Sequence, residues 1–80
     1  MINVKVFIKF KEGVLDPQGK AVKSSLASLG FNEVEEVKVG KYIELKINGN
    51  DAEAARQRVD VMCKKLLANP VIENFEIKIG

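Results

Sequence analysis

Residues 2–10 alternate between apolar and polar side chains with a period of two. The apolar positions are Ile2, Val4, Val6, Ile8 and Phe10. This alternation, rich in β-branched residues, is typical of a β-strand and predicts a sheet with one buried face. Phe7 is the exception on the polar side. Two interpretations stay open for it: a surface aromatic shielded by lysine stems, or part of a partner surface.

The first helix is marked by local signals at both ends. Asp16 can accept an orphan backbone N–H as N-cap, and Pro17 suits the first helical position. Gly30 is expected to end the helix as a left-handed residue, with Phe31 packing back on Leu26 in a Schellman motif. A helix therefore follows the first strand after a short loop.

A second helix is expected between Asn50 and Asn69. Asn50, with Glu53 three residues later, resembles a capping box, and the Asn69-Pro70 pair stops the helix. Its apolar positions recur every three or four residues, at Ala52, Ala55, Val59, Met62 and Leu66. After it, residues 71–79 alternate again and predict the last strand.

Two further strands, Val34–Val39 and Tyr42–Ile47, are predicted on either side of Gly40-Lys41. A two-residue Gly-Lys turn would put the apolar side chains of the two strands on opposite faces. A three-residue loop over Gly40–Tyr42 keeps one apolar face, so we prefer this loop or a bulge. The alternative is that both faces are buried, one of them by another subunit.

The predicted order is β-α-β-β-α-β in one domain, residues 1–80. With right-handed crossovers this is an α+β, ferredoxin-like fold: an antiparallel sheet with both helices on one face. So small a domain has a thin core. Three-stranded or swapped variants are therefore also open, because a sheet edge can be left for a partner.

Composition excludes several functions. The net charge is +2, too balanced for a strong nucleic-acid binder or a polybasic membrane binder. No apolar run can span a bilayer and no signal peptide is visible, so we expect a cytoplasmic protein. The chain has no histidine, which removes His-based catalytic pairs and His-ligated metals. Its single cysteine, Cys63, excludes an internal disulfide and any CxxC motif.

The remaining residues do not build a convincing active site. Lys20 and Ser24 have the spacing of a dyad, but nothing orients them or supplies an oxyanion hole. Cys63 lies beside the apolar stripe of the second helix and is expected to be a buried structural thiol. The acidic cluster Glu33, Glu35 and Glu36 is best explained as a solvated segment. Gly13 and Gly19 do not form a phosphate loop.

Two functional classes that use this fold without histidine also fit poorly. An RNA-binding module of the RRM type would carry stacking aromatics on the open sheet face, where this sequence shows Lys5, Lys9 and Phe7 but no RNP-like aromatic pair. An acylphosphatase-like enzyme would want an arginine in the loop over residues 11–18, which has none. From the residues alone, an interaction or regulatory module remains, for example one that binds a small ligand at a dimer interface.

Three segments carry a resemblance to a known family: GVLDPQGKAV at residues 13–22, VGKYIEL at residues 39–45 and MCKKLLANPVIE at residues 62–73. Together, and in this order, they resemble the PurS family, the small subunit of the three-component phosphoribosylformylglycinamidine (FGAM) synthase. The length and the order of elements match too, so the resemblance covers essentially the whole chain.

The resemblance implies a non-catalytic role in purine biosynthesis. In that complex a PurQ-type glutaminase subunit releases ammonia, and a PurL-type synthetase subunit uses ATP and Mg to convert formylglycinamide ribonucleotide to FGAM. PurS-like chains form homodimers or higher homo-oligomers, bridge the two other subunits and are thought to help ammonia pass between them. No cofactor, metal, nucleic acid or membrane is then expected on this chain itself.

The family-like segments also suggest an interface. Loops on a rigid scaffold often carry recognition, so the expected partner contacts are Asp16, Pro17, Gln18, Gly19, Lys20, Gly40, Lys41, Tyr42, Asn69 and Pro70. A glycine inside the first helical turn costs about 1 kcal/mol relative to alanine. For Gly19 we therefore expect the close approach of another backbone, from a partner subunit. The alternative is that Gly19 packs against its own sheet or its own dimer mate.

Overall fold

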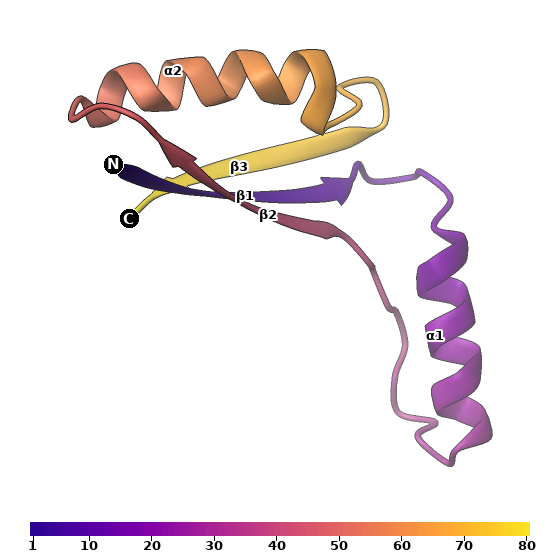
Figure 1. The fold of residues 1–80 in the computed structure, drawn as a ribbon. Coiled ribbons are helices and arrows are strands. Elements are labelled where there is room, and N and C mark those ends of the chain that lie inside the picture. Colours follow the sequence, from indigo (N-terminus) through magenta and orange to yellow (C-terminus); the bar gives the residue numbers. More distant parts are fainter.

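A computed structural model describes all residues 1–80. The elements, in chain order, are β1 (Ile2–Phe10), α1 (Pro17–Ser28), β2 (Lys41–Ile47), α2 (Ala52–Met62) and β3 (Glu73–Ile79). A five-residue π-helical turn, η1 (Cys63–Leu67), continues α2 without a break. Figure 1 shows α2 lying along the sheet and α1 standing apart from it. Neither helix has the length and apolarity of a membrane-spanning segment.

The three strands form one antiparallel sheet in the order β2-β1-β3. In this register Val6 of β1 lies between Ile43 of β2 and Ile77 of β3. Since side chains alternate across a strand, the even positions of β1 share one face with the apolar positions of both neighbours. The strand predicted from the alternation of residues 2–10 is thus confirmed, and it is the central strand of the sheet.

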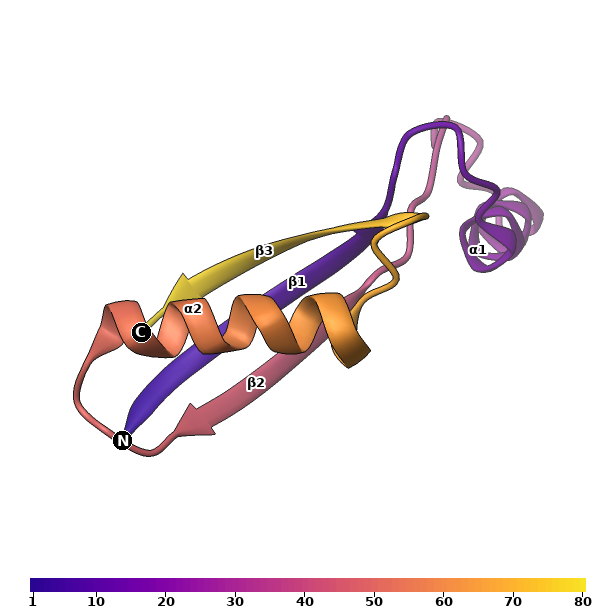
Figure 2. The ribbon, with the colours of Figure 1, turned by 90° about the horizontal axis from the view of Figure 1, so that it is seen from above.

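Helix α2 covers the apolar face of the sheet (Figure 2). Val59 and Cys63 are fully buried against the even-numbered side chains of β1. The cap of α2 differs from the prediction by one residue. Asp51, not Asn50, is the N-cap: its Oδ1 accepts the backbone N–H groups of Glu53 at 3.1 Å and Ala54 at 3.2 Å.

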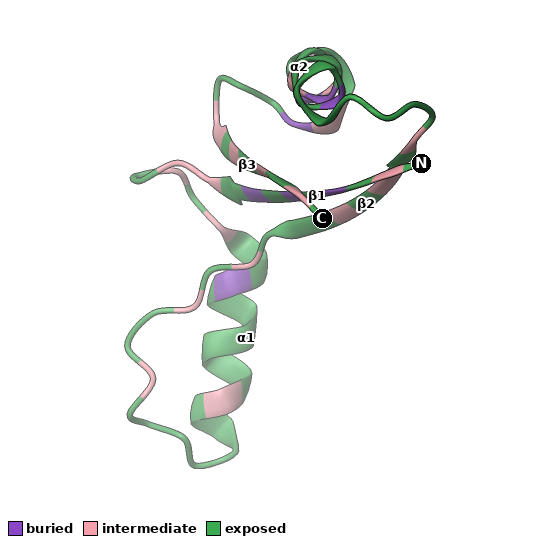
Figure 3. Ribbon diagram, turned by 90° about the vertical axis from the view of Figure 1, so that its left-hand side faces the viewer, coloured by how far each residue is buried: buried purple, intermediate pink, exposed green.

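The other face of the sheet carries no helix, and its side chains are exposed (Figure 3). On this face Phe7 packs against Tyr42, with ring centroids 5.0 Å apart. The Lys78 ammonium lies 5.5 Å from the Phe7 ring centroid. Phe7 is therefore a surface aromatic partly covered by a lysine, which was one of its two predicted roles; a partner contact stays a prediction.

Residues 11–39 form a projection that we call the arm. It consists of a loop, α1 and the return segment, residues 31–39, which runs back beside α1 (Figure 1). The predicted helix ends are confirmed. Pro17 opens the helix after the Asp16 cap, Gly30 has φ +99°, and the Phe31 N–H donates to the Leu26 carbonyl at 2.9 Å. That bond is the Schellman pattern.

The arm departs from the predicted arrangement in two ways. Helix α1 does not share a sheet face with α2 but points away from the sheet (Figure 1). Residues 34–39 are not a strand, because the return segment runs straight into β2 instead of turning back at Gly40. The α+β class and the antiparallel sheet are confirmed, in the three-stranded variant, and the elements present follow the predicted order. The strand predicted at residues 34–39 and its hairpin are absent.

The arm makes the chain elongated. Its extents are 49 × 24 × 14 Å and its radius of gyration is 16.0 Å. A compact chain of 80 residues would have a radius of gyration of about 12 Å. Only eight residues are buried, and seven of them belong to the core between the sheet and the α2 region. The eighth, Gly19, lies in the first turn of α1.

Candidate functional site

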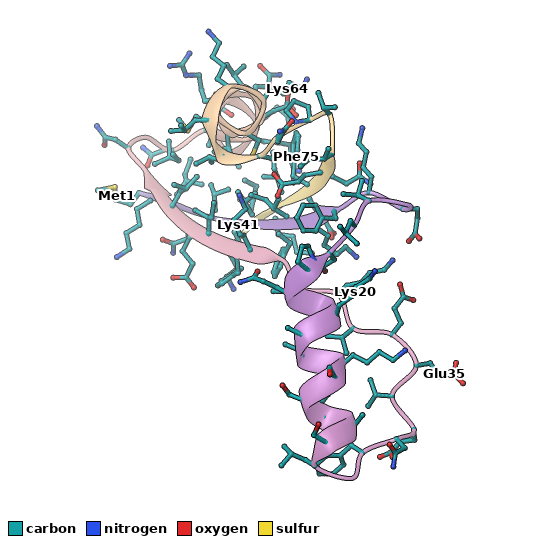
Figure 4. All side chains as sticks on the ribbon, turned by 90° about the vertical axis from the view of Figure 1, so that its right-hand side faces the viewer. Met1, Lys20, Glu35, Lys41, Lys64 and Phe75 are labelled. Carbon is teal, nitrogen blue, oxygen red and sulfur yellow. The ribbon has the colours of Figure 1, made fainter.

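One end of the sheet, which we call the junction, comprises residues 8–10, 40–42 and 69–73. It holds five of the ten predicted interface residues, Gly40, Lys41, Tyr42, Asn69 and Pro70, and the other five, residues 16–20, lie at the start of α1. At the junction β1 ends while β2 and β3 begin. The Lys11 N–H donates to the Ile72 carbonyl at 2.8 Å, so the start of the arm is bonded to the turn before β3. The base of α1 follows directly, and Figure 4 shows Lys20 at the end of α1 that lies next to the sheet.

Asp16 joins two segments at the base of the arm. Its Oδ1 accepts the Gly19 N–H at 2.9 Å and caps α1, while its Oδ2 accepts the Val39 N–H at 2.9 Å. The Val39 bond, and after it the Gly19 bond, lowers the pKa of the Asp16 carboxyl below its ordinary value of 3.8. Both oxygens are thus engaged, one within the helix and one across the arm.

Gly19 is where α1 and the return segment meet. A Cβ placed on Gly19 would overlap the Val37 carbonyl oxygen and crowd the Asp16 carboxylate. The expectation of a close backbone approach at this glycine is therefore confirmed. The Val37 backbone belongs to the chain's own return segment, so this approach comes from within the chain; a contact of Gly19 with a partner subunit stays a prediction.

A surface ion pair joins the loop before α1 to the return segment. The Lys38 ammonium lies 2.6 Å from Oε1 of Glu12, and 3.7 Å from Glu36. The Lys38 hydrogen bond lowers the pKa of Glu12 and, in return, raises the pKa of Lys38. Both side chains are exposed, so the pair adds orientation more than stability.

Gly40 is a second point of close approach. A Cβ on Gly40 would overlap the carbonyl oxygen of Ile8, a residue of the buried core. Its φ is not in the left-handed region, so turn formation does not explain this glycine. The lack of a side chain instead lets the return segment enter the sheet directly beside the end of β1.

Glu73 contacts two of the predicted interface residues, Asn69 and Lys41. Its Oε1 accepts the Asn69 N–H at 2.7 Å, and its Oε2 lies 3.7 Å from the Lys41 ammonium. Lys41 also donates to the Leu67 carbonyl at 3.5 Å. The Glu73 side chain is only 11% exposed. Sequence reasoning missed Glu73, although it closes the family-like segment 62–73.

The turn at residues 69–72 is held firmly yet presents apolar side chains. Asn69 Oδ1 accepts the Val71 N–H at 3.1 Å, and its carbonyl accepts the Glu73 N–H at 2.7 Å. Around this turn Leu66 is 83% exposed and Val71 78% exposed. An apolar surface on a well-bonded turn is suited to recognition, which is the role predicted for Asn69 and Pro70.

A hollow of about 460 Å³ lies at the base of the arm, between the loop, the first turns of α1 and the return segment. The charged residues that line it are Lys11, Glu12, Asp16, Lys20, Lys23, Glu35, Glu36 and Lys38. Four are basic and four acidic, so the hollow offers no net charge to attract an anion or a cation.

The groups that could do chemistry are dispersed. Lys20 and Ser24 are both exposed on α1, and no group of three potential metal ligands converges anywhere in the chain. Cys63 is buried, and burial raises the pKa of its thiol, which keeps it protonated and unreactive. The Tyr42 hydroxyl donates to Glu44 at 2.7 Å, which raises the pKa of Tyr42.

Comparison with known proteins identifies relatives over the whole length of the chain. The sequence model of the family described as PurS: Phosphoribosylformylglycinamidine (FGAM) synthase matches residues 3–80. The PurS subunit of this synthase from Methanocaldococcus jannaschii is 47% identical over 79 residues, 99% of this chain and 95% of the relative. The Bacillus subtilis PurS subunit is 48% identical over 79 residues, covering 99% and 93% of the two chains.

Solved structures agree with the sequence matches. The crystal structure of Methanocaldococcus jannaschii PurS is similar with a TM-score of 0.89 and 45% identity, over 100% of this chain and 96% of that one. A chain in the structure of PurLQS from Thermotoga maritima is similar with a TM-score of 0.88 and 26% identity, over 99% and 96%. The elongated fold with its projecting arm is therefore shared with solved relatives.

Proposed function

The chain belongs to the PurS family of FGAM synthase subunits in purine biosynthesis, and from this membership we propose that it acts in the complex as a non-catalytic subunit. The observation that carries the proposal is the family match, which takes in all but the first two residues. The dispersed titratable groups and the well-bonded, apolar turn at the junction support a docking role.

The partners in this proposal are a PurL-type synthetase subunit and a PurQ-type glutaminase subunit. The chain bridges the two and assists the passage of ammonia from one to the other. The PurLQS assembly among its structural relatives supports this arrangement. ATP and Mg are used by the synthetase subunit, no cofactor is bound by this chain, and the complex works in the cytoplasm.

The proposal also includes self-association as a homodimer or higher homo-oligomer. A helix of 12 residues is marginal in water without tertiary packing, yet α1 contacts little beyond its own arm. The sheet also lacks the strand that a ferredoxin-like fold would place beside β2, so the outer edge of β2 is unpaired. A second copy of the chain that packs on the arm and pairs with this edge would supply tertiary contacts for α1 and hydrogen-bond partners for β2.

Reconstitution tests the proposed function. The synthetase and glutaminase subunits are mixed with formylglycinamide ribonucleotide, ATP and glutamine, with and without this chain, and FGAM is measured. We expect glutamine-dependent synthesis to require the chain. With ammonium salt in place of glutamine, the synthetase should work without it, because no ammonia then has to pass between subunits.

A matched control separates bridging from catalysis. The chain alone, incubated with glutamine, ATP and formylglycinamide ribonucleotide, should release neither glutamate nor ADP above the blank. Release by the isolated chain, or full glutamine-dependent activity in its absence, contradicts the proposal.

A further inference from the structure

The arm keeps its shape with little help from the rest of the molecule. Val22 on helix α1 and Leu29 at its C-cap are exposed, and no residue of α1 except Gly19 is buried. Packing against the core therefore does not hold α1 beside the return segment. The hydrogen bonds and the ion pair that join the two halves lie at the base of the arm.

Three interactions hold the base. Asp16 accepts one N–H from α1 and one from Val39, the bare Cα of Gly19 admits the Val37 carbonyl, and Glu12 pairs with Lys38. The Glu12–Lys38 pair is exposed and weak. The absence of a side chain at Gly19 lets the return segment come close but does not itself attract it. Among these three polar and steric contacts, the two hydrogen bonds of Asp16 are thus the ones that attract the return segment to α1.

The other helix cap shows what is special about Asp16. Asp51 caps α2 through Oδ1 alone, which accepts from Glu53 and Ala54, two and three residues away. Asp16 caps α1 through Oδ1 in the same way, and its Oδ2 accepts the N–H of Val39, 23 residues away. Asp16 thus makes one cap hydrogen bond where Asp51 makes two, and Asp16 alone adds a hydrogen bond that crosses the arm.

We propose that Asp16 is the positioning residue of the arm: by binding α1 and the return segment at once, it presents both to a second copy of this chain as one preformed unit. A preformed arm loses less conformational entropy on association than a loose one. Without the Val39 bond the two halves of the arm must be ordered at the moment of association. The proposal rests on the self-association put forward under the proposed function.

Asparagine at each cap gives a matched pair of variants. Asn is as good an N-cap as Asp and keeps one acceptor oxygen, so Asp51→Asn loses no hydrogen bond. Asp16→Asn keeps the Gly19 bond but points an NH₂ group at the Val39 N–H, two donors facing each other. Each variant removes one negative charge beside a helix N-terminus, so the electrostatic change is the same at both helices.

The readouts are backbone amide exchange by NMR and sedimentation, both on the full chain. In Asp16→Asn we expect the Val39 amide to exchange about tenfold faster, the size expected for one lost hydrogen bond and an unpaired donor. The Val6 amide in the central strand should be unchanged. Self-association should weaken by a similar factor. Asp51→Asn should match the parent in both measurements.

The outcomes separate this proposal from the proposed function. If Asp16→Asn changes neither Val39 exchange nor self-association, Asp16 does not position the arm. If Asp51→Asn weakens self-association equally, loss of charge explains the effect and the proposal is overturned. If the parent chain is monomeric but Asp16→Asn still speeds amide exchange at Val39, then Asp16 orders the arm, and the self-association put forward under the proposed function is contradicted.

Discussion

The Val39 N–H donates to Oδ2 of Asp16 at 2.9 Å, across 23 positions of the chain. This bond makes a helix cap into a tertiary contact. It also explains the spacing of Asp16 and Gly19 in the family-like segment 13–22. The capped N–H and the bare Cα both belong to Gly19, so the return segment can come close at the point where the carboxylate reaches it.

Alanine at Gly19 should open the base of the arm. A single methyl group there overlaps the Val37 carbonyl, so the return segment must move away from α1 and the Asp16–Val39 bond is strained. We expect faster amide exchange at Val39 and weaker self-association, although alanine is the better helix former. The core should melt within a few degrees of the parent, because Gly19 does not touch it.

The control for that variant is Ser24→Ala on the same helix, where the side chain is exposed. It should change neither exchange nor self-association. If Gly19→Ala behaves like Ser24→Ala, the close approach at Gly19 has no consequence for the arm.

Gly40→Ala should damage the core instead of the arm. The overlap here is with the carbonyl of Ile8, which is 1% exposed and belongs to the central strand of the sheet. Shifting this backbone disturbs the β1–β2 ladder, so we expect about 1–3 kcal/mol of lost unfolding free energy. Urea unfolding measures it, and Gly19→Ala in the same assay should lose much less.

Local patterns predicted local structure well. The period-two alternation of residues 2–10, the Asp16 cap and the Gly30 terminus each depend on residues within one element, and each is confirmed. The one local error is the cap of α2, where Asn50 and Asp51 are adjacent and both can cap. Nothing in the pattern alone distinguishes neighbours of equal cap preference.

Long-range pairings were not predictable in the same way. Residues 34–39 alternate like a strand, but a strand exists only with a partner strand, and within this chain none is in reach. The local sequence suggested a turn at Gly40, because its actual contact, with Ile8, is 32 positions away and leaves no trace in the local pattern. Glu73 likewise depends on Lys41, which lies in another strand. These roles appear only once the topology is known.

Removing the Glu73 carboxylate should loosen the turn at residues 69–72. Glu73→Ala leaves the Asn69 N–H without its acceptor and removes the ion pair of Lys41, and we expect a loss of about 1–2 kcal/mol in urea unfolding. Glu73→Gln keeps an oxygen for the Asn69 N–H and gives up only the ion pair with a half-exposed lysine. It should cost less than half as much.

Glu76 offers a control on the same strand. Its carboxylate is 68% exposed and lies 3.8 Å from Lys78, so Glu76→Ala should stay within about 0.5 kcal/mol of the parent. A cost for Glu73→Ala no larger than that of Glu76→Ala would show that the Glu73 network does not stabilise the junction.

Acid should release the arm through Asp16. Since its pKa is lowered in the folded chain, the charged carboxylate stabilises the closed arm above pH about 4, and this contribution is lost as the pH falls through the folded pKa. The Glu12 pKa is lowered too, so its pair with Lys38 weakens in the same direction. The other charged groups around the hollow are Lys11, Lys20, Lys23, Glu35 and Glu36.

The amide proton shift of Val39, followed by NMR as the pH is lowered, reports on Asp16 directly because Val39 donates to its carboxylate. We expect a titration with a midpoint below 3.8, the ordinary value for an aspartate. Glu12→Gln should keep this titration and Asp16→Asn should abolish it, while the Val6 amide in the core stays unchanged in both variants. A midpoint at or above 3.8, or a titration that survives in Asp16→Asn, means that the Val39 bond does not depend on the charged form of Asp16.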